Sequence, residues 1–485
     1  MVKKLKNKKQ GNNSIISNLL WRFSERTAAQ GVGFIVSVVL ARLLTPEDYG
    51  LIGLITVFIS IAAVFVSSGF GNALIQKENA TQTDFSSVFY FSIFMGTAMY
   101  IVLFFAAPWI ADFYNESLLI PVIRVLAVSL IIAGVNSVQQ AYVSKTMQFK
   151  RFFYSTIIGT VISAVIGIYM AYKGFGVWAL VTQNLFNQVI DTLILWFTVK
   201  WRPAFEFSFS EMKKMFDYGW KLLFSSLLDT VYNNLYSLVI GKFYSAKDLG
   251  HYNRGRNIPN MVITNINGSI QSVMFPAFAN CQGDKVRLKT MVRRSIMTST
   301  YIIMPAMIGL AAVAKPLTVL LLTDKWLPSV PFMQFSCFIL AFWPIHTTNL
   351  QAINAVGRSD IFLKLEIIKK IIGFSIMVVS IPFGLYTMMI GNCFSAIISS
   401  FLNASPNRKL LNYGYREQIK DILPAMLLSL FMGGVVLLWT FMDMNNIMIL
   451  VCQVITGAVI YVLGSRLLKL ESYTYIIGMI RSFKK

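Results

Sequence analysis

Apolar stretches of about 20 residues recur along nearly the whole chain, from residue 15 to residue 468. A helix rises 1.5 Å per residue, so each stretch is long enough to cross a hydrocarbon core of ~30 Å. Residues 91–107 and 447–463 are apolar on every side, whereas barrel strands would alternate apolar and polar residues. Only 13% of the residues are charged, against roughly 25% in soluble proteins. The sequence therefore predicts an all-α polytopic membrane protein.

We expect about 14 transmembrane helices, beginning near residues 17, 49, 85, 118, 153, 176, 217, 253, 293, 328, 361, 384, 422 and 445. The connections between them are short and leave no room for a soluble domain. The net charge is +22, and most Lys and Arg residues fall in the tails and in alternate loops. Because basic residues collect on the cytoplasmic side, this pattern predicts a multi-pass protein of the bacterial inner (plasma) membrane with both termini cytoplasmic. It also argues against nucleic acid as a partner.

The two halves of the chain resemble each other at an offset of 200 residues. Residues 41–50 (ARLLTPEDYG) align with residues 241–250 (GKFYSAKDLG), which matches Asp48 with Asp248 and Gly50 with Gly250. Six expected spans separate the copies, and an even number preserves orientation, so we expect two parallel repeats. Each Asp lies in a turn before a span, so helix N-capping explains the pair better than catalysis.

The repeat suggests a division of the chain into lobes. Residues 1–14 would be a basic cytoplasmic tail, residues 15–200 the N-lobe of six spans and residues 201–216 a cytoplasmic linker. Residues 217–404 would form the C-lobe of six spans, residues 405–468 two extra C-terminal spans and residues 469–485 a second basic tail. Substrate paths in such transporters run between the halves, so spans one, two, seven and eight are the first to inspect for polar residues.

The first span carries three charges on one helical face. Arg22, Glu25 and Arg26 are three or four residues apart, and Gln30 and Ser37 continue the same face. A charge at the centre of a membrane helix costs ~2.5–3.5 kcal/mol, so such residues usually face a cavity or one another. Arg22 can instead reach the headgroups, and Glu25 can pair with either arginine. Arg26 lies deeper, and we expect it to line a hydrated cavity.

Span seven repeats the pattern, with Lys221, Asp229 and Asn233 at multiples of four residues. Asp229 would sit near the midplane, where it would pair with a cavity cation or bind a coupling proton or sodium ion. Span eight begins with Arg254, Arg256 and Asn257 near the external interface. These two arginines either extend their side chains to the lipid headgroups or bind an anion at the external opening of the cavity.

Spans four and six add further polar groups. Arg124 lies in span four with Asn136, and Asp191 lies in span six with Asn187. For the amides we expect hydrogen bonds between helices. The four cysteines are widely spaced and are expected to be buried thiols, and no Gly-rich phosphate-binding loop occurs. We therefore expect neither a cofactor nor a metal site.

Two segments connect the chain with a known family. Residues 21–30 (WRFSERTAAQ), running into residues 41–53 (ARLLTPEDYGLIG), resemble the Wzx-type polysaccharide flippases, in the branch of colanic acid and teichuronic acid exporters. Residues 241–253 (GKFYSAKDLGHYN) are similar to the second-half signature of the same family. The resemblance implies the multidrug, oligosaccharidyl-lipid and polysaccharide (MOP) exporter superfamily, with two six-helix lobes and alternating access. It also implies that cavity arginines hold the cargo diphosphate, a role carried to Arg22 and Arg26 by position.

The leading functional hypothesis is a flippase that moves a polyprenyl-diphosphate-linked oligosaccharide to the periplasmic leaflet for surface polysaccharide or lipopolysaccharide biosynthesis. Its partners would be this cargo, membrane lipids and polysaccharide polymerase machinery. An ion-coupled multidrug exporter of the same superfamily would favour a carboxylate-lined cavity without arginine. A membrane glycosyltransferase or polymerase would need larger external loops than residues 45–50 or 441–446, so we expect no enzyme.

The candidate residues fall into two sets. For binding the diphosphate and glycan we predict Arg22, Arg26, Lys221, Arg124, Arg254, Arg256, Asn233 and Asn257. For ion coupling the candidates are Glu25, Asp229 and Asp191.

Overall fold

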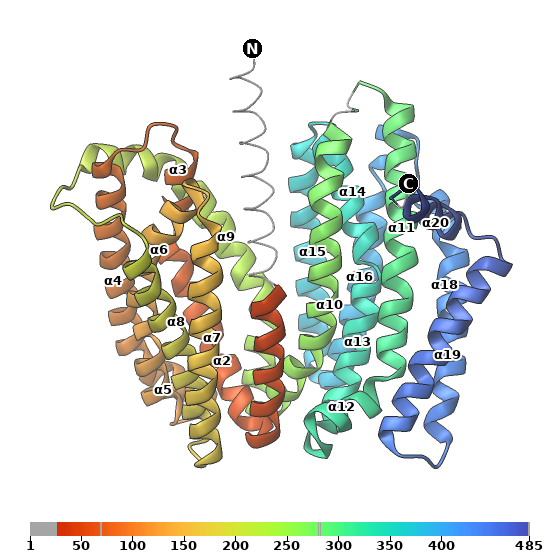
Figure 1. Cartoon of the computed structure of the whole chain (residues 1–485), viewed down its shortest axis with the longest axis horizontal. Coiled ribbons are helices and arrows are strands. Elements are labelled where there is room, and N and C mark those ends of the chain that lie inside the picture. Colours follow the sequence, from red (N-terminus) through yellow and green to blue (C-terminus); the bar gives the residue numbers. More distant parts are fainter. Residues whose placement is uncertain (1–26, 68–69, 280, 282, 484–485) are drawn as a thin grey trace. The chain divides into compact units, whose positions relative to one another are not determined.

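The computed structural model describes residues 27–67, 70–279, 281 and 283–483, which form helices joined by short connections, without a β-strand among them (Figure 1). Internal contacts divide the chain into two compact units, Met1–Gly250 and His251–Lys485. Nine helical stretches in the described part are long and apolar enough to cross a membrane. The prediction of an all-helical polytopic membrane protein is confirmed, while the lobe boundaries stay a prediction.

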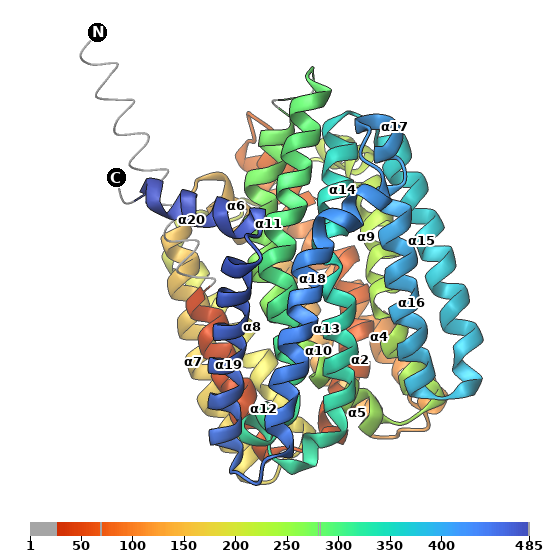
Figure 2. The same ribbon diagram turned by 90° about the vertical axis from the view of Figure 1, so that its right-hand side faces the viewer.

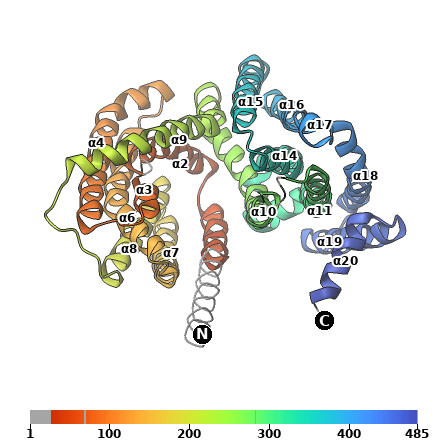
Figure 3. The same cartoon turned by 90° about the horizontal axis from the view of Figure 1, so that it is seen from above.

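The first unit begins, in its described part, with the helix Thr27–Leu43. It continues with α2 (Pro46–Ser67), α3 (Phe70–Gln76), α4 (Gln82–Tyr114), α5 (Leu119–Leu126), α6 (Val128–Lys145), α7 (Phe149–Tyr172), α8 (Val177–Thr198) and α9 (Phe209–Phe243). Helix α10 (Ala246–Ala279) starts in this unit and continues into the second. Helices α7 and α8 pack along each other, and α9 packs on α2 and α4 (Figure 3).

The second unit holds the rest of α10 and all later helices. These are α11 (Lys285–Ala312), α12 (Ala314–Leu322), α13 (Val330–Ala341), α14 (Trp343–Ala355), α15 (Ser359–Ser380), α16 (Leu385–Ala404), α17 (Asn407–Leu411), α18 (Tyr415–Leu438), α19 (Asn446–Leu467) and α20 (Glu471–Phe483). The 3-10 turns are η1 (Asp324–Ser329), η2 (Ile381–Phe383) and η3 (Trp439–Phe441). Helix α11 packs against α13, α14 and α18. Helix α20 runs across the direction of the long helices of this unit (Figure 2).

The repeat-related turns form matching caps. The Thr45 amide donates to the Asp48 carboxylate at 2.9 Å, and the Asp48 amide donates to the Thr45 hydroxyl at 3.2 Å. In the second copy the Asp248 amide donates to the Ser245 hydroxyl at 3.0 Å, and that hydroxyl donates to the Asp248 carboxylate at 2.7 Å. Thr45 and Ser245 are thus the N-cap residues, and Asp48 and Asp248 are their capping partners three residues later, which confirms a capping role for both carboxylates.

The same two turns contact each other through glycine. A Cβ atom on Gly50 would lie 1.7 Å from the carbonyl oxygen of Ala246, and a Cβ atom on Gly250 would lie 1.8 Å from that of Pro46. Each copy of the turn thus presents a glycine to the backbone of the other. Because the opposing atoms belong to the backbone, no side-chain movement could make room for a methyl group.

The connection between α8 and α9 is held against the start of α4. The amides of Ala204 and Ser208 donate to the hydroxyls of Ser86 and Ser87, both at 2.9 Å. Helix α9 starts at Phe209, inside the segment expected as a linker, because the Ser208 hydroxyl accepts the Glu211 amide and caps a new helix. Hydrogen bonds thus fix the connection that leads into α9 to the start of α4.

Candidate functional site: a polar cavity in the first unit

Helices α2, α6 and α8 line a cavity of about 510 Å³ within the first unit. Its polar lining consists of Ser60, Ser67, Asn136, Ser137, Gln140, Asn187, Gln188, Asp191 and Thr192. Asp191 is the one carboxylate among the lining residues, and none of them carries a basic group. An ionised Asp191 would therefore make this cavity negative, which favours a cation over a phosphate.

The hydrogen bonds around the cavity join helices, as the sequence predicts for these amides. The Asn136 side-chain amide of α6 donates to the Asp191 carboxylate of α8 at 2.9 Å. The Asn187 amide reaches the hydroxyls of Thr160 and Ser163 on α7, at 3.4 and 3.3 Å. Within the described residues Asp191 has no basic partner. The carboxylate is thus oriented by an amide rather than by a salt bridge.

Two further oxygens beside this carboxylate lack partners. The Asn136 Oδ1 and Thr192 Oγ1 atoms are buried and have no hydrogen-bond partner in the described part of the chain. Both residues are only 7% exposed. Buried polar atoms are nearly always hydrogen-bonded to protein or water, so these two oxygens call for a polar occupant. Carboxylate, amide and hydroxyl oxygens suit a hard cation, a hydrated proton or a sugar hydroxyl.

The predicted basic residues that the structure describes lie outside this cavity. Arg124 of α5 sits 4.3 Å from the Phe104 ring centre and donates to the Phe104 carbonyl at 3.3 Å. Arg256 lies over the Tyr252 ring at 5.1 Å and donates to its hydroxyl at 2.5 Å. The ring contact occupies one face of each guanidinium.

Arg254 is packed inside the second unit. It is 6% exposed and lies 5.8 Å from the ring centre of Trp326 in η1, which also contacts the His251 ring at 5.7 Å. A Cβ atom on Gly255 would come within 2.6 Å of the Ser329 carbonyl oxygen, so the backbones approach closely here. This packing gives Arg254 a structural role in the second unit.

The polar stripe of span seven lies on the uncovered side of α9. Lys221, Ser225, Asp229 and Asn233 are all exposed, whereas Ser237 is buried. Asn257 of α10 is exposed as well. Four residues of this stripe are thus exposed on α9, and their role in binding stays a prediction. Arg22, Glu25 and Arg26 lie outside the described residues.

Sequence reasoning found part of the cavity and missed the rest. Asn136, Gln140, Asn187 and Asp191 stand out as polar groups in apolar spans, but the lining residues Ser60, Ser137 and Thr192 do not. A signal existed in α6, where Asn136, Ser137 and Gln140 share one helical face. Hydroxyl side chains are too common in membrane helices to single out individually.

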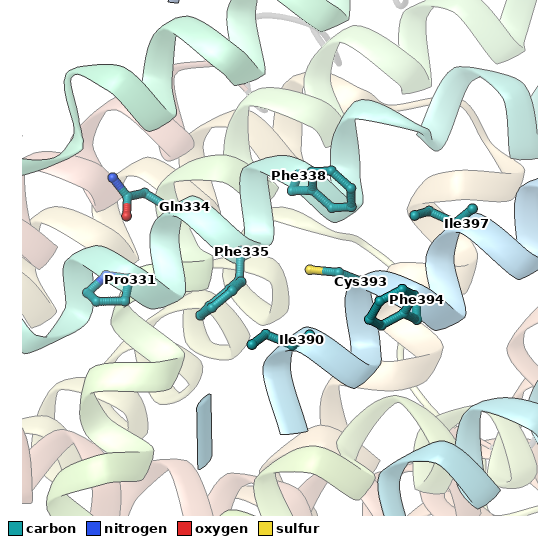
Figure 4. A pocket seen from close by; sticks show the side chains of 8 residues that line it. All are labelled: Pro331, Gln334, Phe335, Phe338, Ile390, Cys393, Phe394 and Ile397. Carbon is teal, nitrogen blue, oxygen red and sulfur yellow. The ribbon is translucent and has the colours of Figure 1, made fainter. Parts of the chain in front are cut away.

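A second, apolar groove of about 370 Å³ lies in the second unit between α13 and α16 (Figure 4). Side chains of Phe335 and Phe338 on α13 and of Ile390, Cys393 and Phe394 on α16 surround it. None of its lining residues is charged. Such a groove suits hydrocarbon, and its Gln334 amide carries no charge that would hold a diphosphate.

Residues 39–331 match the family model described as polysaccharide biosynthesis protein. The chain is 27% identical to the teichuronic acid biosynthesis protein TuaB of Bacillus subtilis over 62% of each chain, so it spans less than two thirds of that relative. It is 23% identical to the lipopolysaccharide biosynthesis protein WzxC of Escherichia coli, over 86% of this chain and 87% of WzxC. It is 22% identical to the succinoglycan biosynthesis transport protein ExoT of Rhizobium meliloti, over 74% of this chain and 72% of ExoT.

The fold is similar to that of a solved transporter. The structure of the lipid II flippase MurJ in an inward closed conformation matches with a TM-score of 0.73 at 14% sequence identity, covering 95% of this chain and all of MurJ. At that identity the match concerns the fold alone.

Proposed function

Because the chain belongs to the polysaccharide biosynthesis protein family, we propose that it flips a polyprenyl-diphosphate-linked oligosaccharide from the cytoplasmic to the periplasmic or outer leaflet. The chain is a multi-pass membrane transporter of polysaccharide biosynthesis, Wzx-like and of the MOP superfamily, and it is not an enzyme. The main support for the cargo is the family match, which covers both repeat-related turns and the whole polar cavity. Alternating access would carry the cargo across, and polymerase machinery would consume the flipped product.

A deletion strain tests this function in cells. We expect loss of surface polysaccharide and accumulation of lipid-linked oligosaccharide that a membrane-impermeant glycan label cannot reach, with both restored by the plasmid-borne gene. Normal surface polysaccharide together with increased sensitivity to cationic drugs would instead support a multidrug exporter. The assay distinguishes the two functions because loss of a flippase removes surface polysaccharide, whereas loss of a multidrug exporter changes drug sensitivity.

We also propose fourteen spans with both termini in the cytoplasm. The nine apolar stretches account for most of them, and five more polar helices supply the rest: the helix Thr27–Leu43, α8, α9, α10 and α15. Polar faces are expected in helices that line a hydrated path, which explains their lower hydropathy. The basic tails then lie on the cytoplasmic side.

Single cysteines in a cysteine-free background test this orientation. Cysteines replacing Asn115, Lys173 or Met442 should react with an impermeant thiol reagent added outside intact spheroplasts. Cysteines replacing Gln282 or Asn412 should react only after permeabilisation. The reverse labelling pattern would place the termini outside and invert the direction of transport.

The two candidate sets divide by charge. For the diphosphate we propose Arg22 and Arg26 together with exposed Lys221, Asn233 and Asn257, since guanidinium forks and amides suit phosphate and sugar oxygens. Arg124, Arg254 and Arg256 stay candidates for the same set because their guanidinium groups are permanently charged. For ion coupling we propose Asp191, in its cavity of oxygens, while Glu25 and Asp229 stay candidates.

A further inference from the structure

A salt-bridge cluster fixes helix α20 in the second unit. The Arg293 guanidinium of α11 donates two hydrogen bonds to Glu471 in the first turn of α20, at 3.1 and 2.9 Å. Its Nε donates to Asp421 of α18 at 3.0 Å, and the Tyr413 hydroxyl donates to the same carboxylate at 2.7 Å. One arginine thus ties the start of α20 to two long helices.

Helix α20 has one covered and one open side. Tyr473 and Ile476 pack against the hydrophobic cluster that includes Tyr301, Leu428 and Tyr461. Thr474, Tyr475, Gly478 and Arg481 are exposed. The helix follows the last apolar stretch and runs across the long helices (Figure 2). We expect an amphipathic helix so placed to lie in the membrane interface, at the depth of lipid headgroups.

A cavity of about 480 Å³ opens beside this helix. It is lined by Arg294, Met297, Thr298, Lys469, Glu471, Ser472, Thr474 and Tyr475. Arg294 lies 5.6 Å from the Tyr475 ring centre, and neither Arg294 nor Lys469 pairs with a carboxylate among the described residues. Glu471, the only acidic lining residue, is already engaged by Arg293. The cavity therefore combines two uncompensated cations with hydroxyl groups.

The backbone at Lys469 is unusual. Its φ is +48°, a left-handed conformation at the end of a helix that glycine normally occupies. The Lys469 amide donates to the Arg466 carbonyl at 3.2 Å and the Leu470 amide donates to the Ser465 carbonyl at 3.1 Å, so the turn itself needs no lysine. The ammonium group is thus present at a position where stability alone favours glycine.

We propose that this cavity binds the phosphate of an anionic phospholipid headgroup, such as phosphatidylglycerol, from the leaflet that contacts α20. Arg294 would hold the phosphate oxygens as a fork and Lys469 would add a second charge. The hydroxyls of Thr298, Ser472 and Thr474 suit the glycerol part of the headgroup. Basic pockets between membrane helices bind such headgroups. None of its lining residues belongs to the set proposed for the cargo diphosphate, and its test does not depend on transport.

Lipid binding to the purified full-length protein tests the site. Native mass spectrometry with phosphatidylglycerol and phosphatidylcholine should show preferential binding of the anionic lipid to wild type. The double variant Arg294→Gln/Lys469→Gly should bind phosphatidylglycerol at least tenfold more weakly while remaining monodisperse, because glycine fits the turn. A matched control, Arg466→Gln/Arg481→Gln, removes two exposed basic groups that do not line the cavity, and it should bind like wild type.

Three outcomes would overturn the assignment. Equal affinity of the double variant and wild type would remove the cavity from lipid binding, and so would equal binding of phosphatidylcholine by wild type. Displacement of phosphatidylglycerol by inorganic diphosphate at equal concentration would assign the cavity to a diphosphate instead. If the double variant fails to fold, Lys469→Gly alone replaces it and should still weaken binding severalfold, and unchanged binding by that variant would contradict the proposal.

Discussion

Replacing Gly50 with Val is expected to abolish the accumulation of folded protein. The added Cβ would lie 1.7 Å from the Ala246 carbonyl oxygen, far inside any contact distance, and the obstacle is backbone. The start of α2 would have to separate from the start of α10. Steric changes that the surroundings cannot absorb exceed ~4 kcal/mol, a large part of a stability of about 5–15 kcal/mol. Gly250→Val should behave alike, because its Cβ would meet the Pro46 carbonyl oxygen at 1.8 Å.

Fluorescence-detected size-exclusion chromatography of tagged variants measures this effect as the height of the monodisperse peak. Gly434→Val on α18 is the matched control, because a Cβ atom there would meet no atom within 4 Å. It should give a peak close to that of wild type. A wild-type peak for Gly50→Val would show that the two turns are not in contact in the folded protein.

Asp191→Asn is expected to lower flipping at least tenfold in purified protein while leaving the fold intact. Asparagine can keep the hydrogen bond from Asn136, at 2.9 Å in wild type, through its side-chain oxygen. It can neither ionise nor take up a proton, so a cation would lose its one charged ligand in the cavity. The remaining activity should no longer depend on the coupling ion.

Two variants separate coupling from structure at Asp191. Asp112→Asn removes an exposed carboxylate near the end of α4 and should flip at the wild-type rate. Asp191→Ala leaves the Asn136 amide without its partner and should lower thermal stability as well as flipping, since an unpaired buried donor costs about 1–3 kcal/mol. A wild-type rate with unchanged ion dependence in Asp191→Asn would eliminate the coupling role.

Helices and caps follow from local sequence, which explains why they could be predicted. Apolar length located the spans, and Thr45 with Asp48 forms its capping box within four residues. Breaks inside spans were harder to predict. The span expected near residue 328 is divided into α13 and α14, where Pro344 lies in the first turn of α14. The span expected near residue 118 is divided into α5 and α6 at Ala127, and no proline lies at that break.

The candidate site depended on contacts distant in sequence. Helical periodicity places Arg254 on a face of its helix, but only packing decides that Trp326, from a later turn, covers it. The close approach of Gly50 to Ala246 likewise follows from tertiary structure. The sequence repeat showed only that a glycine occurs at the same position in both copies. Asp191 was recognised because a carboxylate in an apolar span is costly. Its partner Asn136 lies 55 residues earlier in the chain, and no pattern in the sequence links the two.

The most direct test of the flippase proposal uses purified wild-type protein in liposomes that contain a labelled polyprenyl-diphosphate oligosaccharide. An impermeant glycan-modifying reagent added outside reports how much cargo has reached the outer leaflet. With the protein present, the modified fraction should rise from about half to nearly all of the cargo within minutes, whereas protein-free liposomes should stay at about half. Labelled phosphatidylcholine in the same vesicles should not move between the leaflets. Equal flipping of both lipids, or none of the cargo under any imposed ion gradient or membrane potential, would contradict a selective flippase.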